Sequence, residues 1–533
     1  MPAPPTDFDL VIVGGGINGA GIARDAALRG LSVLLLEKND FGSGTSSWSS
    51  RLIHGGLRYL EYGELPLVFE SLRERRQLRR VAPHLVKRLR IKIPVYRRGR
   101  RSLFVVRLGM IAYDLLSLGK SVPRHRILNR QTFLAQEPGI NADGLVGGAS
   151  YFDAQVTFAE RLVLENVLGA KQAGAEVRNY SPVIGIHVRQ RKVRSVEYLD
   201  PLSGEEQEVS TRMVINAAGP WVDRVLRTVN REIRGLMGGT KGSHIVVGKF
   251  AEAPRDAFYI EAAEDGRPFF IIPWNQQYLI GTTDLRYQGD PGEVVASDEE
   301  IEYLLRETNR VFPAANLRVD DIHFAYAGVR PLPRRAKGPE AAITRRHIIK
   351  KHGRQAKGLV SIVGGKLTTY RNLAEQTVDF AVRVLKIPAK ACATRTLYLP
   401  GGENIEQARR ELVAIKYLSA MGRERMLHIY GGATLQIVAL AESEPALHGT
   451  VDDADSVMRA EVVYAIRNEF ALSLIDIVHR RLMIGLSADQ GAHMADTIAG
   501  IAASELNWSG SEKAAQLQML QTYNQRLKPA RQA

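Results

Sequence analysis

The chain has 533 residues, of which 45% are hydrophobic, and a formal net charge of +15. This length allows two or three domains, each with its own core, in an ordinary globular protein. The single cysteine, Cys392, excludes an internal disulfide and a Cys₄ iron–sulfur site, and we expect no metal. No window holds the roughly 18 apolar residues of a membrane-spanning helix, and residues 1–9 lack a signal-peptide pattern, so we expect a cytoplasmic protein.

The first predicted unit is a strand, a glycine turn, a helix and a second strand. Residues 9–13 are apolar, glycines interrupt the run at 14–19, residues 20–28 suit a helix, and residues 33–36 are apolar again. This order is typical of a βαβ unit, which opens a doubly wound α/β fold.

The next segment carries most of the excess charge. Between Arg73 and Arg107 there are 14 Lys or Arg and a single acid, Glu74. Apolar and cationic residues alternate over 86–98, and the apolar run 103–118 follows. This pattern favours a surface that meets anionic lipid, over a plain solvated face or a nucleic-acid site, because no recognised nucleic-acid-binding module accompanies it. We expect no nucleic-acid partner.

The remainder mixes strands with helices and then becomes helical. Strand-like runs occur at 183–186, 244–247, 269–272 and 278–280, with helical patterns at 158–170 and 298–311. These elements predict an α+β substrate domain with an antiparallel sheet. After about residue 400, apolar residues recur three or four apart, which predicts a mainly helical region behind a linker near 399–402.

The glycine turn fits the dinucleotide-binding pattern G-x-G-x-x-G. Gly14, Gly16 and Gly19 would permit a tight turn, close approach of a pyrophosphate and tight packing of helix on strand. The helix N-terminus then offers free N–H groups to the phosphates. Glu37, at the end of the second strand, is placed to accept ribose hydroxyls, which favours FAD or NAD over NADP.

Three further segments favour FAD over NAD. Residues 45–50 are rich in hydroxyls that suit a pyrophosphate or flavin edge. Small residues at 216–219 follow an apolar run at 213–215 and would let the backbone pass close to a flat cofactor. The apolar strand 359–363 precedes Gly364-Gly365-Lys366 and a helix, so a second helix N-terminus would face the cofactor.

The chain resembles the FAD-dependent, quinone-linked glycerol-3-phosphate dehydrogenase family, within the amino-acid-oxidase-like flavoproteins. Trp48 and Arg51 are local departures that remove no group the chemistry needs. The matching strings span nearly 360 residues in the family's order: 12–21, 45–59, 216–222, 241–247, 281–284, 328–332 and 364–371.

The resemblance implies a fold with α/β and α+β parts. It comprises a Rossmann-like FAD-binding domain at 1–399, an interleaved antiparallel-sheet substrate part at roughly 70–150 and 230–340, and a helical C-terminal domain at 400–533. It also leads us to expect a homodimer.

The implied reaction oxidises sn-glycerol 3-phosphate to dihydroxyacetone phosphate, with the hydride passing to FAD. Such a reaction needs a base, for which His54 is the first choice and His244 the second, since imidazole titrates near neutral pH. Arg330, between glycine and proline, resembles the family's substrate arginine, and Arg58 could assist. Lys366 could stabilise negative charge on reduced flavin or bind phosphate, and His244 is also a candidate substrate contact.

The resemblance and the glycine motif together give a set of candidate contacts for non-covalent FAD. They are Gly14, Gly16, Gly19, Glu37, Lys38, Thr45, Ser46, Ser47, Ser50, Leu52, Gly55, Gly219, Gly365, Lys366, Leu367 and Thr368.

The electron acceptor is less well defined by the sequence. The chain shows no second redox centre, so reduced flavin needs a diffusible acceptor, and the basic, apolar segment favours membrane quinone at the inner face of the cell membrane. Three alternatives remain: a glycerol-3-phosphate oxidase that uses oxygen and forms hydrogen peroxide, an amino-acid or N-methyl oxidase, and a scaffold that holds FAD only structurally.

Overall fold

The structure is a computed structural model of the whole chain. It describes residues 7–61, 63–117, 119, 122–201, 203–229, 233–334 and 343–530, and the side chains of Arg58 and Glu61 lie outside this description.

The first sheet has a mostly parallel core. Among the described residues it has eight strands, and β1 pairs in parallel with both β2 and β10, β10 with β18, and β2 with β7. The strands are β1 (Phe8–Val13), β2 (Val33–Leu36), β7 (Glu176–Arg178), β8 (Val183–Arg189), β9 (Lys192–Leu199), β10 (Glu206–Asn216), β17 (Ile348–Lys351) and β18 (Leu359–Val363). The predicted α/β fold is confirmed.

Helices cover both faces of this sheet because its strands are apolar on both sides. Leu10 and Ile12 of β1 pack with α1 (Ile17–Leu28), α6 (Ala159–Gln172) and α9 (Tyr370–Leu385). Val11 and Val13 pack on the other face with α7 (Val222–Val229) and the β8–β9 hairpin. Helix α1 begins at Ile17, three residues before the predicted start, so its free N–H groups lie directly at the glycine turn.

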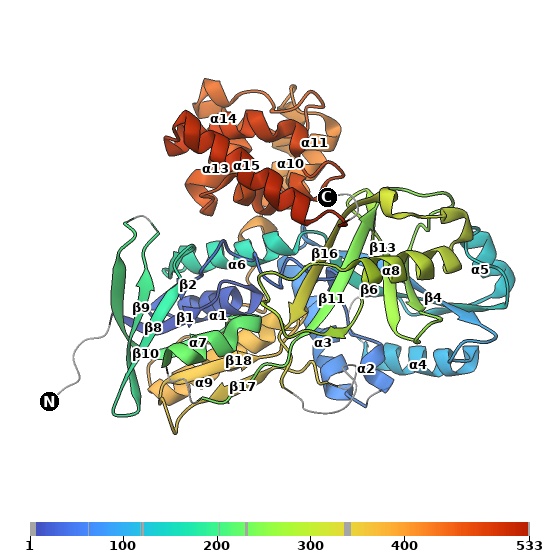
Figure 1. Cartoon of the computed structure of the whole chain (residues 1–533), viewed down its shortest axis with the longest axis horizontal. Helices are drawn as coiled ribbons and strands as arrows, with labels where there is room; N and C mark the ends of the chain where they lie inside the picture. The colour runs from blue at the N-terminus through green and yellow to red at the C-terminus, as the bar shows by residue number, and fades with distance from the viewer. Residues whose placement is uncertain are drawn as a thin grey trace.

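The second sheet holds the antiparallel strands of the middle region. In the described part of the chain it has ten strands, in the order β15-β11-β14-β13-β12-β4-β6-β3, with β16 on β11 and β5 on β6. The strands are β3 (Leu52–Ile53), β4 (Val86–Tyr96), β5 (Arg126–Asn129), β6 (Leu145–Val156), β11 (Thr240–Val247), β12 (Ala257–Glu261), β13 (Pro268–Trp274), β14 (Gln277–Gly281), β15 (Leu285–Arg286) and β16 (Ile322–Arg330). The two sheets lie side by side (Figure 1).

Helices also flank the second sheet. Helix α8 (Asp298–Val311) packs on a core that includes Ile245 and Ile271, while α3 (Leu65–Val81) and α4 (Leu103–Leu116) pack near Ile91 and Tyr151. Helix α2 (Arg58–Glu61) precedes α3, and α5 (Arg130–Gln136) packs on β6.

The basic segment 86–98 does not expose its apolar side chains together with its cations. Residues 86–96 form β4, which lies between β6 and β12, so Ile91, Ile93 and Val95 are buried in the core while most of the cations remain exposed. Lys92 is buried as well and pairs with Glu137 at 2.7 Å. The exposed apolar side chains belong to the next helix, α4, where Phe104, Leu108, Ile111 and Leu115 share one outer face.

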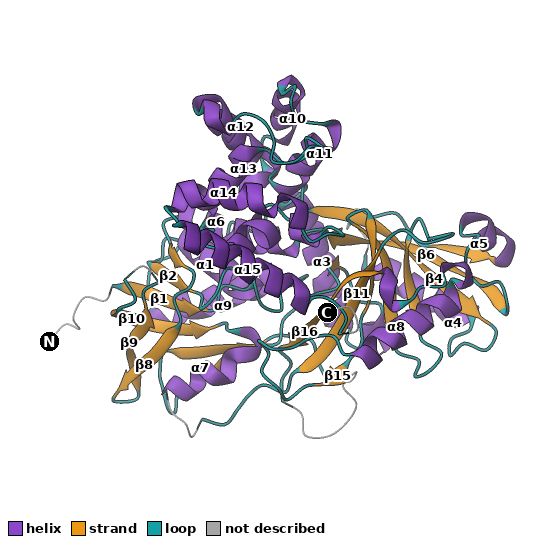
Figure 2. Ribbon diagram, turned by 45° about the horizontal axis from the view of Figure 1, so that its top comes forward, coloured by secondary structure: helices purple, strands orange, loops and turns teal. Residues whose placement is uncertain are grey.

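The region after residue 400 forms a helical bundle, which Figure 2 shows above the two sheets. Its helices are α10 (Ile405–Ala414), α11 (Ala420–Ile429), α12 (Thr434–Ser443), α13 (Arg459–Glu469), α14 (Ala495–Leu506) and α15 (Gly510–Arg526). Helix α13 ends where Phe470 takes a left-handed conformation (φ 61°). A π-helical turn, Asp476–Arg481, follows.

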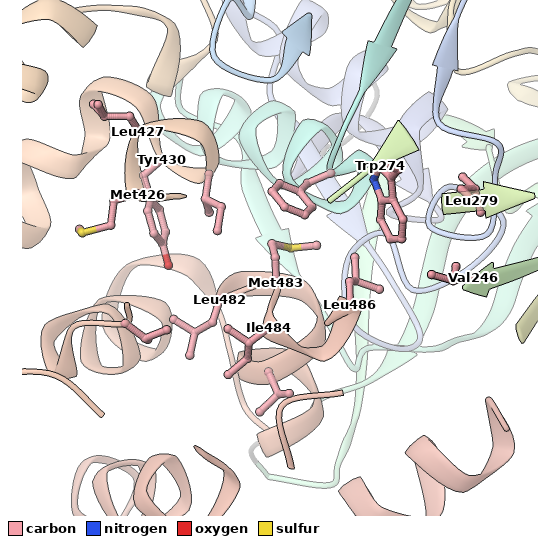
Figure 3. Close-up of a cluster of buried hydrophobic side chains, with 14 of the residues drawn as sticks. Val246, Trp274, Leu279, Met426, Leu427, Tyr430, Leu482, Met483, Ile484 and Leu486 are labelled. Carbon is pink, nitrogen blue, oxygen red and sulfur yellow. The ribbon is translucent and has the colours of Figure 1, made fainter. Parts of the chain in front are cut away.

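The helical region and the second sheet share one apolar core. Figure 3 shows Met483 and Leu486, from just after the π-helical turn, near Trp274 of β13 and Leu279 of β14. Gln277 adds a polar contact, since its side-chain amide donates to the Leu486 carbonyl at 2.8 Å. The predicted linker at 399–402 is packed too, because the Gly401 N–H donates to Glu165. No described helix has both the length and the apolar character needed to span a membrane.

Candidate active site

A cavity of about 940 Å³ lies at the carboxyl ends of β1 and β2 and extends to β16 and the start of α9. Carboxyl ends of parallel strands are where open α/β sheets bind ligands. The glycine turn, the loop after β2, the start of α9 and the C-terminal helix α15 all contribute to its walls.

The walls of this cavity fit a dinucleotide. Gly14 has φ +107°, and a Cβ there would lie 2.8 Å from the Ala217 carbonyl oxygen, while a Cβ on Gly19 would lie 1.8 Å from the Gly14 oxygen. Neither position tolerates a side chain, as the fingerprint requires. Asn18 Oδ1 and Trp221 Nε1, on lining residues, are buried without a hydrogen-bond partner among the described atoms, so both are available to a ligand.

Glu37 is held at the end of β2 by the backbone. Its carboxylate accepts the Gly15 N–H at 2.6 Å and the Asn39 N–H at 2.9 Å, while burial raises its pKa. The neighbouring Lys38 lies over the Trp221 ring, 4.1 Å from the centroid. Both residues line the cavity, as a ribose or adenine contact requires.

The structure separates the predicted cofactor contacts into two groups. Ten line the cavity: Gly14, Gly16, Glu37, Lys38, Thr45, Ser46, Gly219, Gly365, Lys366 and Leu367. Six are not part of its lining: Gly19, Ser47, Ser50, Leu52, Gly55 and Thr368. Of these, Ser47 donates to the Gly42 carbonyl and Leu52 belongs to the core, so both support lining residues rather than face the cavity.

His54 follows β3 and is fixed through its backbone and its ring. Its N–H donates to Thr368 Oγ1 at 3.2 Å, and its ring meets Phe270 edge to face at 6.2 Å. Burial lowers its pKa to about 4, and the charge of Lys366 acts in the same direction against that of Asp153. The imidazole is therefore neutral at neutral pH, and a weaker base than an unperturbed histidine.

Lys366 lies at the start of the α9 segment, in the cavity wall. Its Nζ is 3.6 Å from the centroid of the Tyr59 ring and donates to Ser71 Oγ at 3.4 Å. Burial lowers its pKa to about 7, with the Arg345 charge acting in the same direction and Glu64 and Glu70 opposing it.

Arg330 and Arg345 converge on one carboxylate. Arg330 pairs with Asp284 Oδ1 at 3.1 Å, and Arg345 pairs with Asp284 Oδ2 at 3.2 Å. Arg330 also donates to Thr282 Oγ1 at 3.0 Å, so its guanidinium has a fixed orientation. The side chain of Arg58, the other predicted arginine, lies outside the described residues.

His244, on β11, lies beside the same group of cations. Its Nε2 is 2.8 Å from Ser50 Oγ, and its ring stacks on Tyr326 with centroids 4.9 Å apart. Burial lowers its pKa to about 3, and the charge of Arg330 adds to the effect. Arg330 and Arg345 share Asp284, and each of three cations lowers the pKa of a neighbour: Arg330 that of His244, Arg345 that of Lys366, and Lys366 that of His54.

The sequence reasoning missed several neighbours of the site. Asp284 and Tyr59 lie within segments already matched to the family. The sequence therefore indicated that they lie near the site, but not which side chains they contact. Arg345 follows a segment with no motif, and nothing in its surroundings distinguishes it from a surface arginine. The α15 residues were also missed, because no local pattern tells which helix of a bundle covers a distant cavity.

Comparison with family models gives two matches. Residues 9–371 match the family described as FAD dependent oxidoreductase. Residues 392–513 match the C-terminal domain of alpha-glycerophosphate oxidase. Together the two matches cover both the sheets and most of the helical region.

Named relatives agree with this assignment. The chain is 45% identical to a Synechocystis glycerol-3-phosphate dehydrogenase, over 97% of this chain and 96% of that protein. It is 34% identical to an aerobic glycerol-3-phosphate dehydrogenase of Staphylococcus haemolyticus, over 89% and 86% of the two chains.

Solved structures give the same result. The Bacillus halodurans glycerol-3-phosphate dehydrogenase complexed with FAD aligns with a TM-score of 0.80 and 29% identity, over 98% of this chain and 95% of that one. A Mycoplasma pneumoniae L-α-glycerophosphate oxidase shares the fold, with a TM-score of 0.56 and 18% identity, over 73% and 98%. The chain therefore belongs to the FAD-dependent glycerol-3-phosphate dehydrogenase family.

Proposed function

We propose that the protein oxidises sn-glycerol 3-phosphate to dihydroxyacetone phosphate and passes the electrons to membrane quinone. The observation that carries the substrate assignment is the convergence of Arg330 and Arg345 on Asp284. Arg330 lies between Val329 and Pro331, which line the cavity that fits FAD, although neither arginine and neither candidate histidine is itself a lining residue. Two guanidinium groups supply the double positive charge and the forked donors that suit a phosphate dianion.

Each candidate residue has a separate role in this proposal. Arg330 and Arg345 bind the substrate phosphate, with Arg58 as a further candidate. His54, neutral because desolvation lowers its pKa, accepts the proton of the C2 hydroxyl, and His244 is the second candidate for that base and for a substrate contact. FAD, when bound, supplies the two-electron acceptor for the C2 hydride. Lys366 provides positive charge at the wall between cofactor and substrate.

The outer face of α4 supports a quinone rather than oxygen as acceptor. Phe104 is 68% exposed and Leu115 62% exposed, and Arg107 is exposed beside them. Helix α3 packs against α4 and also carries Ser71, the partner of Lys366. Helix α4 also reaches the loop that carries His54, because the Gly55 N–H donates to the Tyr113 hydroxyl oxygen at 3.1 Å. A helix is about 10 Å across, so α4 itself separates this loop from its outer face by about one helix diameter. We infer peripheral binding at the inner face of the membrane.

The deciding experiment is an anaerobic visible spectrum of the purified protein before and after addition of sn-glycerol 3-phosphate. We expect the flavin bands to bleach and to recover rapidly with a quinone but slowly with air. Recovery that is faster with oxygen, together with hydrogen peroxide, would favour the oxidase. A flavin band that glycerol 3-phosphate does not bleach would contradict the substrate, and sedimentation would test the expected homodimer.

A further inference from the structure

The loop between β2 and β3 is tied to the helical region by a buried carboxylate. Asp40, 1% exposed, accepts two hydrogen bonds from Arg481, at 2.8 and 2.7 Å, and one from Arg480 Nε at 2.5 Å. Both arginines belong to the π-helical turn, and short π-helical segments occur frequently at functional sites. Although burial opposes it, their charges hold the pKa of Asp40 below its usual value, so the carboxylate stays ionised.

The same loop forms part of the cavity wall. The Asp40 carbonyl accepts the Ser43 N–H at 3.2 Å, and the Gly42 N–H donates to the Gly15 carbonyl at 3.1 Å. Ser46 Oγ then accepts the Ile17 N–H at 3.0 Å, at the first turn of α1. The loop therefore connects Asp40 to the glycine turn through a few consecutive hydrogen bonds.

The helical region also lies at the cavity directly. Arg480 is a lining residue, as are Met519 and Tyr523 of α15. Arg480 is oriented by Asp476, at 2.5 Å, and Asp476 also accepts the Tyr180 hydroxyl at 2.7 Å. Burial with two carboxylates fixes this arginine, so it cannot swing away without leaving charges unpaired.

We propose that the helical C-terminal region contributes to FAD retention. Arg481 and Arg480 bind Asp40 and thereby position the loop after β2, which forms part of the cofactor cavity. Asp40 and Arg481 are positioning residues, since they act through Ser43 to Ser46. The inference rests on the proposed placement of FAD in this cavity.

A second buried pair provides a matched control. Arg161 of α6 makes two 2.7 Å bonds to Glu469, the last residue of α13, with side chains 1% and 0% exposed. This pair also joins the helical region to the first sheet's helices, but neither residue lines the cavity. Asp40→Asn and Glu469→Gln both turn a buried carboxylate into an amide, although Asp40 binds two arginines where the Glu469 carboxylate binds Arg161. Arg481 Nε also donates to the Glu469 backbone carbonyl at 2.7 Å, a bond that Glu469→Gln leaves in place. Both changes should lower the melting temperature.

The experiment measures FAD release from diluted holoenzyme, by the rise in free flavin fluorescence, well below the melting temperature. We expect Asp40→Asn to accelerate release by about tenfold or more and Glu469→Gln to leave it near the wild-type rate. Equal release rates in the two variants, or a wild-type rate in Asp40→Asn, would overturn the proposal.

If Asp40→Asn fails to fold, Arg481→Met with Arg161→Met as its control gives the same comparison, because Asp40 keeps Arg480. The outcome is independent of the substrate, since bleaching by glycerol 3-phosphate tests wild-type turnover while release tests cofactor retention alone.

Discussion

Two histidines of similar character compete for the role of the base. His54 is half-buried and His244 is buried, and both have lowered pKa values, about 4 and about 3, so protonation state does not distinguish them. Their surroundings do, because His244 Nε2 already faces Ser50 Oγ at 2.8 Å, while the His54 ring meets Phe270 edge to face. This difference favours His54 as the group that meets the substrate hydroxyl.

Replacing His54 by Asn should therefore slow anaerobic flavin reduction by about a hundredfold or more, with limited change in substrate affinity, as loss of a general base does. Stopped-flow absorbance at saturating substrate measures it. His244→Asn is the paired variant, and a larger loss there would transfer the role to His244. His187→Asn is the control, because His187 is exposed on β8, and it should leave the rate of flavin reduction unchanged.

Lys366 makes a prediction about pH. Its pKa is lowered to about 7, so the ammonium form is present below that pH and is lost as the pH rises through it. His54, with a pKa of about 4, stays neutral over the same range. We expect kcat/KM to decline above about pH 7 because positive charge leaves the site.

The control for this pH profile is Lys366→Arg, because a guanidinium keeps its charge throughout the range. The decline should move to higher pH in this variant, whatever its absolute rate. Identical basic limbs in wild type and Lys366→Arg would assign the decline to another group. An acid limb near pH 6 would come from the substrate phosphate itself.

At the level of secondary structure, α4 makes the sharpest prediction. Its outer face carries Phe104, Leu108, Ile111 and Leu115, and a carboxylate there would oppose both apolar insertion and anionic lipid. We expect Leu108→Asp to reduce co-sedimentation with phosphatidylglycerol-containing vesicles by about tenfold, and added salt to weaken wild-type binding.

Val413→Asp is the matched control for α4, since Val413 is 62% exposed on α10, in the helical region. It should leave vesicle binding unchanged. If wild type and Leu108→Asp both remain in the supernatant, the apolar face of α4 is not a lipid-binding surface and the preference for quinone loses its support.

Elements with strong local patterns were predictable. The unit β1-α1-β2, helix α8 and strand β18 follow from apolar spacing and glycine positions, both of which act within a few residues. Strand β4 shows the limit, because alternating cations and apolar residues suit an amphipathic surface and a central strand equally. Only pairing with β6 and β12 decides that Lys92 is buried against Glu137.

The site divides in the same way. The glycines and hydroxyl side chains of the cofactor cavity were predictable. A bound phosphate needs the backbone to approach it closely and needs hydrogen-bond donors near a helix N-terminus. The Arg345–Asp284 pair and the Arg481–Asp40 pair were not predictable. Their partners lie 61 and 441 residues apart in the chain, respectively. Such contacts depend on tertiary packing, which no local pattern encodes.

For the whole molecule, the apolar core decides how the helical region behaves. One continuous cluster includes Trp274 and Leu279 of the second sheet together with Met483 and Leu486. Buried ion pairs join the region to the first sheet as well, at Asp40 and at Glu469, and breaking one exposes an unpaired charge. Separate unfolding of the helical region would therefore have to open a core and break both pairs.

We accordingly expect the holoenzyme to unfold in a single calorimetric transition, although chains of this size often unfold in steps. Helix loss by circular dichroism and flavin release by fluorescence should coincide with it, because the helical region lines the cofactor cavity. Glu469→Gln should shift all three signals down together. Loss of helix at a clearly lower temperature than flavin release would mean that the helical region opens alone, and that the shared core contributes too little to bind the two parts into one cooperative unit.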